Sequence, residues 1–189
     1  VSIQAHASKV SGISWGNLEK KGTAAVAQLV TGSWDHSIKV WDIESRDCVL
    51  TLNGSRVVSC LDTSHHSSGI VATGHPDCTV RLWDVRANDS KQSNLLVANS
   101  AFKPSHKEWI TSVKWSPVQA YHLASTSNDG TIKFWDIRSS LPLYSVRAFS
   151  KDQKGLCLAY DTDGTVYAGG TDCIVKEFKP LLPQIHSNE

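Results

Sequence analysis

The sequence predicts an all-β protein, a β-propeller built of four-stranded antiparallel blades, with about four blades present. Three observations predict this fold. A pattern of about twelve residues recurs without gaps, and its copies are spaced at about the length of one blade. Each copy also reads as a strand, a tight turn and a second strand whose polar and apolar residues alternate.

The recurring pattern ends in Trp-Asp in its first three copies. These copies occupy residues 31–42, 73–84 and 125–136, and a degraded fourth copy occupies residues 168–178. The first two tryptophans, Trp41 and Trp83, are 42 residues apart, and Trp135 follows after 52 more. A period of about 40–45 residues is expected for one propeller blade. The spacing therefore indicates one copy in each blade.

Each copy is flanked by further short strands, which complete the blades. Strands are expected ahead of the four copies at residues 9–15, 57–63, 110–115 and 155–160, and outer strands after the first three at residues 49–52, 95–98 and 143–147. The fourth copy has no predicted outer strand, because Pro180 and Pro183 interrupt Leu181 and Leu182, and proline cannot donate to a ladder. The predicted blades are residues 1–52, 53–99, 100–148 and 149–180, with a tail at 181–189.

Composition and charge exclude several classes of protein. The formal net charge is +1, so no overall field steers the surface onto nucleic acid or an anionic membrane. No apolar run reaches the length of about 20 residues that a membrane span needs. The five cysteines are odd in number and widely spaced without a Cys-x-x-C pair, so they are expected to be reduced structural thiols. The first residue is Val1 and no methionine occurs, which indicates a piece of a longer protein.

On these residues the chain resembles the WD-repeat family from about His6 to Phe178. The resemblance implies that each blade is held by a buried network of His, Ser or Thr, Asp and Trp. The matching residues are His6, Thr31, Asp35 and Trp41 in blade one; Thr73, Asp77 and Trp83 in blade two; His106, Ser125, Asp129 and Trp135 in blade three; and Asp172 in blade four. Blade two has Gly54 and Ser55 where a histidine is expected, and blade four keeps only Asp172 of the network. The second and fourth blades are therefore predicted to be less stable than the others.

The recurring Ser/Thr, His and Asp residues also suggest a hydrolase triad, but the repeat favours a structural interpretation. An enzyme does not need two nucleophilic triads, and here the trio recurs with the blades. Neither metal ligands at suitable spacing nor a glycine-rich phosphate loop is evident in the sequence. We therefore expect no catalytic residue, no metal, no cofactor and no small-molecule substrate.

The resemblance also places candidate partner-binding residues on one face of the disc. The residue just before each network aspartate is expected to point outward, and Trp109 is expected at the same edge. These candidates are Trp34, Pro76, Trp109, Asn128 and Thr171. Exposed tryptophan is the residue type most enriched in binding hot spots, although packing against the neighbouring blade would explain each tryptophan equally well.

A closer resemblance is to the ribosome-biogenesis branch of the family, whose members partner pescadillo and the block-of-proliferation protein. It is carried by residues 33–45, 81–84 and 109–117 and by the second blade's lack of a histidine at residues 51–55. The resemblance implies the last four blades of a seven-bladed ring. It also implies a non-catalytic scaffold for large-subunit assembly and ribosomal RNA maturation on the pre-ribosome, in the nucleolus and nucleoplasm. RNA is expected to be reached indirectly, and no membrane is involved.

The alternative is a substrate receptor of a cullin-type ubiquitin ligase. Its basis is the Trp-Asp-x-Arg motif, which occurs twice and ends in Arg86 and Arg138. An arginine after such a strand often pairs locally with an acid, and many WD repeats carry the motif without that partner. Pull-down of the ligase adaptor, as opposed to pescadillo-complex subunits, would distinguish the two functions.

Overall fold

The computed structural model describes residues 2–18, 26–66, 69–85, 106–139 and 141–179, where the regular elements are β-strands in four antiparallel sheets. The strands are β1 (Val10–Leu18), β2 (Val26–Ser33), β3 (Ser37–Asp42), β4 (Cys48–Asn53), β5 (Cys60–Thr63), β6 (Ile70–Gly74), β7 (Val80–Asp84), β8 (Ile110–Trp115), β9 (His122–Ser127), β10 (Thr131–Asp136), β11 (Pro142–Arg147), β12 (Gly155–Tyr160), β13 (Val166–Gly170) and β14 (Val175–Phe178). In this part of the chain, no helix is long and apolar enough to cross a membrane.

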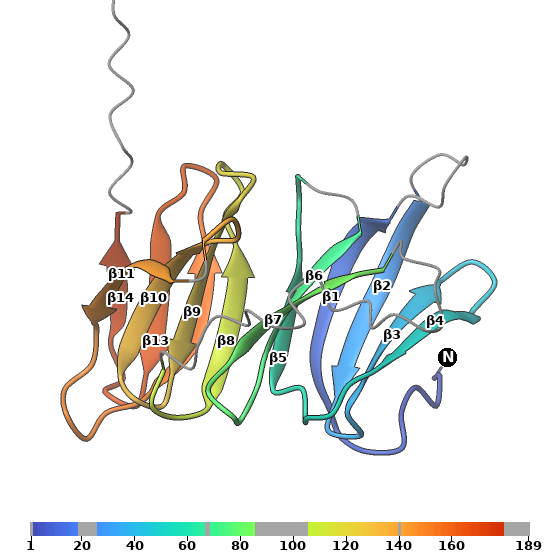
Figure 1. Cartoon of the computed structure of the whole chain (residues 1–189), viewed down its shortest axis with the longest axis horizontal. Helices are drawn as coiled ribbons and strands as arrows, with labels where there is room; N and C mark the ends of the chain where they lie inside the picture. Colours follow the sequence, from blue (N-terminus) through green and yellow to red (C-terminus); the bar gives the residue numbers. More distant parts are fainter. Residues whose placement is uncertain (1, 19–25, 67–68, 86–105, 140, 180–189) are drawn as a thin grey trace, which may run out of the picture.

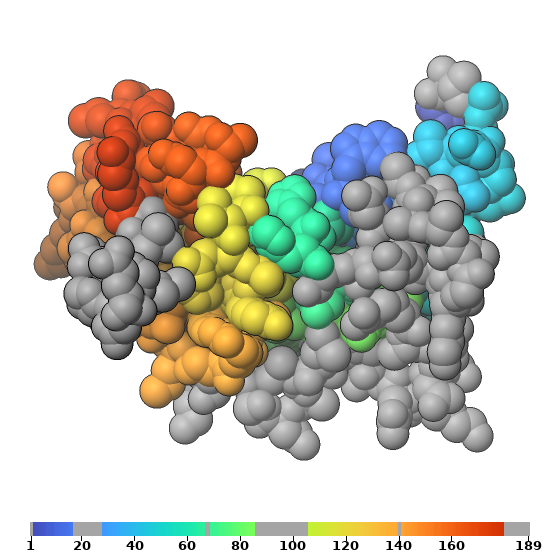
Figure 2. Space-filling model, turned by 90° about the horizontal axis from the view of Figure 1, so that it is seen from above, coloured from blue at the N-terminus to red at the C-terminus, as the bar shows by residue number. Residues whose placement is uncertain are grey.

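Each sheet is one blade, and the blades follow one another in sequence order. Blade one is β1–β4, blade two β5–β7, blade three β8–β11 and blade four β12–β14. Figure 1 shows the sheets side by side, and Figure 2 shows them as an arc with a hollow between blade one in blue and blade four in orange. The first strands of all four blades line an open hollow of about 420 Å³. The first strand of each blade is therefore innermost, as in a propeller.

The predicted strands agree with this architecture. The strands expected at residues 110–115 and 155–160 are β8 and β12, and those expected at 49–52 and 143–147 lie within β4 and β11. The strand expected at 57–63 begins later, at Cys60. Blade four has three strands in the described residues, as predicted, whereas the outer strand expected at 95–98 lies outside them.

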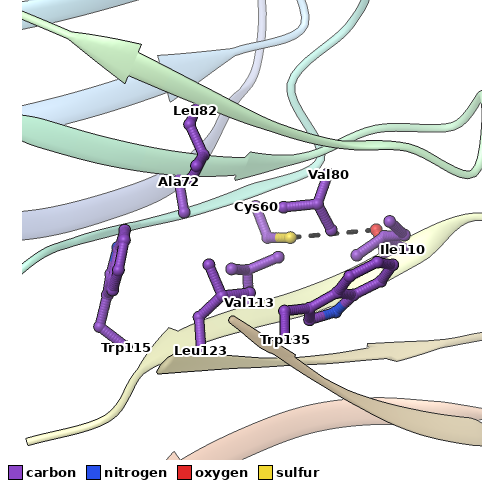
Figure 3. Packing of buried hydrophobic residues seen from close by; sticks show 9 residues of the cluster. All are labelled: Cys60, Ala72, Val80, Leu82, Ile110, Val113, Trp115, Leu123 and Trp135. Atoms are coloured by element: carbon purple, nitrogen blue, oxygen red, sulfur yellow. Dashed lines mark hydrogen bonds between the residues drawn. The ribbon is translucent and has the colours of Figure 1, made fainter. Parts of the chain in front are cut away.

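Apolar side chains between neighbouring blades form the core. Figure 3 shows the cluster between blades two and three, where strands β5–β7 meet β8–β10. The largest members, Trp115 and Trp135, are 2% and 1% exposed. Fully burying one large apolar side chain contributes about 1.5–3 kcal/mol, so adjacent blades stabilise one another strongly.

A hydroxyl near the start of the innermost strand links each blade to the next. Ser11 Oγ donates to carbonyl oxygens of Gly32 in its own blade and Val58 in blade two, at 3.2 and 2.5 Å. Ser59 Oγ bridges blades two and three, and Thr111 Oγ1 bridges blades three and four, in the same way. In blade four this position is Leu156, which is 46% exposed. The hydroxyl link therefore recurs three times and then stops.

The face of blade one that points away from blade two is apolar and open. Ile13 is 62% exposed, while Leu61, Val113 and Leu158, which occupy the same register position in the other blades, are at most 6% exposed. Trp15, two residues further along β1, is 60% exposed. The repeat geometry shows why: a preceding blade covers the equivalent residue in blades two to four.

We predict that the isolated chain associates through this open face. Light scattering should detect oligomers or aggregates, because contiguous exposed apolar surface favours association. Replacing Ile13 and Trp15 together with Thr and Gln should shift the chain towards monomer. The matched control is Val118→Thr, at an exposed residue on the β8–β9 turn. A chain that is already monodisperse with a sharp melting transition would contradict the prediction.

Candidate partner-binding surface and its polar framework

A four-residue network fixes the turn between β2 and β3 in blade one. His6 Nδ1 lies 3.0 Å from Asp35 Oδ2, and His6 Nε2 lies 2.8 Å from Thr31 Oγ1. Because a carboxylate only accepts, Nδ1–H donates to Asp35, and Nε2 accepts from the Thr31 hydroxyl. The Trp41 indole N–H donates to the same Thr31 oxygen at 2.9 Å. The four residues predicted for this blade are thus one connected hydrogen-bonded unit.

Blade three repeats this unit with serine in place of threonine. His106 Nδ1 is 3.1 Å from Asp129 Oδ2, His106 Nε2 is 2.8 Å from Ser125 Oγ, and Trp135 Nε1 donates to Ser125 Oγ at 2.8 Å. Burial acts to raise the pKa of Asp129, but hydrogen bonds from His106, Thr131 and the Lys107 amide hold it well below its usual range. The aspartate is therefore a carboxylate across the neutral range and fixes the chain that enters the blade.

Blade two corrects the prediction of a half-satisfied network. The bond from Trp83 Nε1 to Thr73 Oγ1 is present at 2.8 Å, but Thr73 continues to His75 Nε2, also at 2.8 Å. His75 Nδ1 donates to the Val57 carbonyl at 2.8 Å. A histidine two residues after Thr73 thus replaces the one expected before the first strand, so this predicted reason for a softer blade two is wrong. The sequence signal for this substitute histidine was the third position of the repeat, which is His75 in the second copy but Ser33 and Ser127 in the first and third copies.

Asp77, predicted as part of this network, has other partners. It accepts from Arg81 at 2.6 Å and from Thr79 at 2.5 Å. Asp172 in blade four likewise pairs with the cation four residues later, Lys176, at 2.5 Å. In both blades a cation on the third strand takes the place of the histidine at the aspartate. Blade four also has Ala168 and Phe178 at the Ser/Thr and Trp register positions, so its softness stays a prediction.

Backbone hydrogen bonds hold the residues that precede the network aspartates at one edge of the blades. The amides of Trp34, Asn128 and Thr171 donate to the carbonyls of Lys9, Trp109 and Lys154, each at 2.9–3.0 Å. Pro76 has no N–H for this bond, and His75 supplies the donor to Val57 instead. Trp34 and Thr171 are exposed, while Pro76 and Asn128 are half-buried. The β2–β3 turn that carries Trp34 lies at the lower edge of Figure 1.

Two tryptophans from non-adjacent blades meet at this edge. The Trp34 and Trp109 ring centroids are 6.4 Å apart in an edge-to-face arrangement. Trp34 is 39% exposed and Trp109 is 48% exposed. The Lys9 ammonium lies 4.8 Å from the Trp34 ring centroid. We call Lys9, Trp34, Pro76, Trp109 and Asn128 the tryptophan patch. The structure brings the two predicted aromatic candidates together in an exposed position, where they also contact each other.

A row of polar side chains on the innermost strands was not anticipated from the sequence. Ser14, Asp62 and Lys114 occupy the same register position in blades one, two and three. Asp62 is 4% exposed, and its Oδ1 accepts from Ser14 Oγ and Lys114 Nζ, both at 3.1 Å. Its Oδ2 accepts from the Trp115 amide at 2.9 Å. One carboxylate thus joins three blades.

The Trp-Asp-x-Arg arginine that the structure describes is already engaged. Arg138 binds Asp136 through Nε and a terminal nitrogen, at 2.9 and 2.5 Å, and its guanidinium lies 4.5 Å from the Tyr121 ring centroid. The hydrogen bonds from Arg138 lower the pKa of Asp136 despite the opposing effect of burial. Arg86 lies outside the described residues. The pairing of Arg138 with Asp136 therefore agrees with a local structural role for the arginine of this motif.

The cysteines and the other acidic and histidine side chains do not assemble a reactive centre in the described residues. No group of three or more potential metal ligands occurs there. Burial raises the pKa of the Cys60 thiol to about 12, so it is protonated and unreactive. All five cysteines are free thiols, and Cys48, Cys157 and Cys173 are exposed, so these three do not contribute to the buried core.

Comparison with known proteins gives a consistent result. The family model described as "WD domain, G-beta repeat" matches residues 1–42, 46–84 and 99–136. The chain is similar to proteins named "Ribosome biogenesis protein WDR12 homolog" from Chlamydomonas reinhardtii (33% identity, 94% of this chain and 38% of that protein), Dictyostelium discoideum (37%, 77% and 32%) and Oryza sativa (32%, 88% and 35%). The chain therefore spans less than two fifths of the length of these relatives.

Among solved structures, the chain is similar to the computationally designed Ika4 protein. The TM-score is 0.67 at 24% sequence identity, over 94% of each chain. At this identity the likeness concerns the fold alone.

Proposed function

The chain belongs to the WD-repeat family, and we propose that it is a non-catalytic scaffold for assembly of the large ribosomal subunit. The similarity over most of the chain to relatives named as ribosome-biogenesis proteins carries this proposal. The proposed role includes ribosomal RNA maturation on the pre-ribosome, in the nucleolus and nucleoplasm. Its proposed partners are subunits of the pescadillo and block-of-proliferation type, and RNA is reached through such proteins.

The tryptophan patch supports a binding role for this end of the blades. Trp34 sits on a turn that Asp35 and His6 hold in place, so little conformational freedom is lost when a partner contacts it. Pro76, Asn128 and Thr171 lie at corresponding turn positions in blades two, three and four, and Trp109 lies directly before β8 beside the turn of Asn128. We propose that the partner contacts this edge and that Trp34 and Trp109 supply most of the binding free energy.

We predict that Trp34→Ala weakens partner binding and leaves the fold nearly intact. Tagged chain expressed in eukaryotic cells should recover large-subunit assembly factors, and the variant should recover about tenfold less, as expected for the loss of a hot-spot side chain. The thermal midpoint should change little, because Trp34 lies at an exposed turn. Tyr121→Ala removes an exposed aromatic ring from the β8–β9 turn and is the matched control.

The same pull-down distinguishes the ubiquitin-ligase alternative. Recovery of a ligase adaptor that is lost in Arg138→Ala would favour that alternative and contradict the scaffold proposal. Unchanged recovery of assembly factors by Trp34→Ala, or unfolding of this variant, would contradict the assignment of the patch. The pairing of Arg138 with Asp136 supports a local role for the arginine.

A further inference from the structure

A cavity of about 680 Å³ lies between blades three and four. It is at the ends of the blades where the β8–β9 and β12–β13 turns lie, opposite to the β2–β3 turn that carries Trp34. Its walls are largely apolar and include Leu143 on β11, Tyr160 on β12 and the rings of Phe134 and Tyr144, which stack with their centroids 4.5 Å apart. Such a recess favours an apolar occupant.

The charged groups at this cavity do not select an anion. Arg138 binds Asp136 through two nitrogens, and Lys179 Nζ lies 3.7 Å from Glu177 Oε1. Asp163 adds a further acid to the lining. An occupant would therefore be recognised by its apolar surface and not by its charge.

The repeat has an apolar side chain at the same place in two other blades. The residue directly after Trp-Asp is Val85 in blade two and Ile137 in blade three. Each is half-buried and packs against the core that its blade shares with the preceding one. Ile43 is the equivalent residue of blade one, which has no preceding blade in the described part of the chain, and it is 38% exposed. This position therefore packs against the preceding blade wherever one is described.

Blade four continues differently from this position. Lys179 stands in the place of the repeat's aspartate, and Pro180, Leu181 and Leu182 follow. In blades two and three, the backbone amide after Trp-Asp donates to the carbonyl of the residue before the second strand, at 2.8 and 2.9 Å. Pro180 has no N–H for this bond. The two leucines are the first branched apolar side chains after Lys179 that could serve at this place.

We propose that Leu181 and Leu182 bind in this cavity and so close the interface between blades three and four at its open end. Lys179 lines the cavity, and residues two and three positions further along can lie at most about 7 and 10 Å from it on an extended chain. Both leucines are therefore within reach of the apolar walls. No partner takes part, so this role of the segment goes beyond the proposed function and does not depend on it.

Two physical effects favour this contact. Covering Phe134, Tyr144 and the exposed Leu143 removes apolar surface from water. Prolines on both sides of the leucines, Pro180 and Pro183, restrict the free segment, so less conformational entropy is lost on binding. Because proline cannot donate to a ladder, the segment would bind through its side chains and not as a fourth strand.

Photo-crosslinking of the full chain tests where the segment binds. With p-benzoylphenylalanine in place of Leu182, ultraviolet light should join this position to Leu143 or Tyr144, as mapped by tandem mass spectrometry. The matched control carries the same group in place of Asn188, further along the segment, and should show no preference for these residues. Mixing isotopically labelled and unlabelled chains distinguishes crosslinks within one chain from crosslinks between two.

Thermal melting tests whether the contact stabilises the chain. Leu181→Ser and Leu182→Ser together should lower the thermal midpoint by about 5 °C, because buried apolar surface is lost. Ile185→Ser changes an apolar residue of the same segment outside the proposed contact and should shift the midpoint by less than about 1 °C. Leu143→Lys should abolish the effect of the leucine substitutions, whereas Leu141→Lys, at another exposed leucine of the β10–β11 region, should preserve it.

Three results would overturn the proposal. These are crosslinks from position 182 spread evenly over the exposed surface, crosslinks that form mainly between chains, and a thermal midpoint that the leucine substitutions leave unchanged. Crosslinks between chains would make the segment of a second copy the occupant. Recovery of ribosome-assembly factors is measured in a separate pull-down, so a failure here would leave the proposed function standing.

Discussion

Asp62→Ala should lower the free energy of unfolding by about 3 kcal/mol, as expected when one partner of a buried charged network is removed. The substitution removes the acceptor for the Trp115 amide, which is buried, and for the Lys114 ammonium and Ser14 hydroxyl. The buried amide would then lack a partner in a poorly hydrated place, whereas the Lys114 ammonium, whose side chain is 36% exposed, would be solvated by water. Because these groups belong to three blades, the change should weaken two interfaces at once.

Equilibrium denaturation in urea, followed by tryptophan fluorescence, measures this loss. Asp62→Asn keeps the shape and one carbonyl acceptor, so its effect should be about half as large. Asp47→Ala, at an exposed turn residue, is the matched control and should change the unfolding free energy by less than about 0.5 kcal/mol. A loss below about 1 kcal/mol for Asp62→Ala would contradict the role assigned to this carboxylate.

The second large effect expected is a loss of stability in mild acid that depends on His75. Burial, with a smaller contribution from Arg81, lowers the pKa of His75 from its ordinary 6.5 to about 4. Below pH 6.5 the unfolded chain takes up a proton that the folded chain excludes, so the unfolding free energy falls until pH approaches 4. A shift of this size corresponds to about 3 kcal/mol. Burial lowers the pKa of His106 as well, which adds to the loss in the same direction.

His75→Ser tests this linkage, because serine is the residue that blades one and three have at this position. The variant should be less stable at pH 7.5, since Thr73 and the Val57 carbonyl lose their partner, and its stability should fall less between pH 6.5 and 4.5. His66→Ser, at an exposed turn, is the matched control. Denaturant titrations at several pH values would reject the linkage if the wild type and His75→Ser lost stability in parallel.

Much of the fold could be predicted because the information is local and repeated. The Trp-Asp pattern and the alternation of β3 and β10 predicted the strands, and the prolines after Phe178 predicted the three strands that the described part of blade four contains. The networks of blades one and three followed from one resemblance applied residue by residue. These features depend on short stretches of chain whose periodicity is that of a strand.

The contacts that depend on the relative positions of blades could not be predicted in the same way. The meeting of Trp34 with Trp109 requires the spacing of three blades, which no periodicity within a strand contains. Asp62 joins Ser14 and Lys114 only when three innermost strands are in register. A signal was nevertheless present, because an aspartate inside the short strand Cys60–Thr63 is costly to bury without partners.

The hydroxyl links of Ser11, Ser59 and Thr111 join each blade to its sequence neighbour, so the molecule resembles a chain of coupled segments. In such an array the resistance of a unit to opening depends on how many neighbours hold it. Blades two and three have two neighbours. Blade four is joined to blade three by the link from Thr111, but its own hydroxyl position is Leu156. Slow amide exchange should therefore be concentrated in the middle of the array, and opening should begin at its ends.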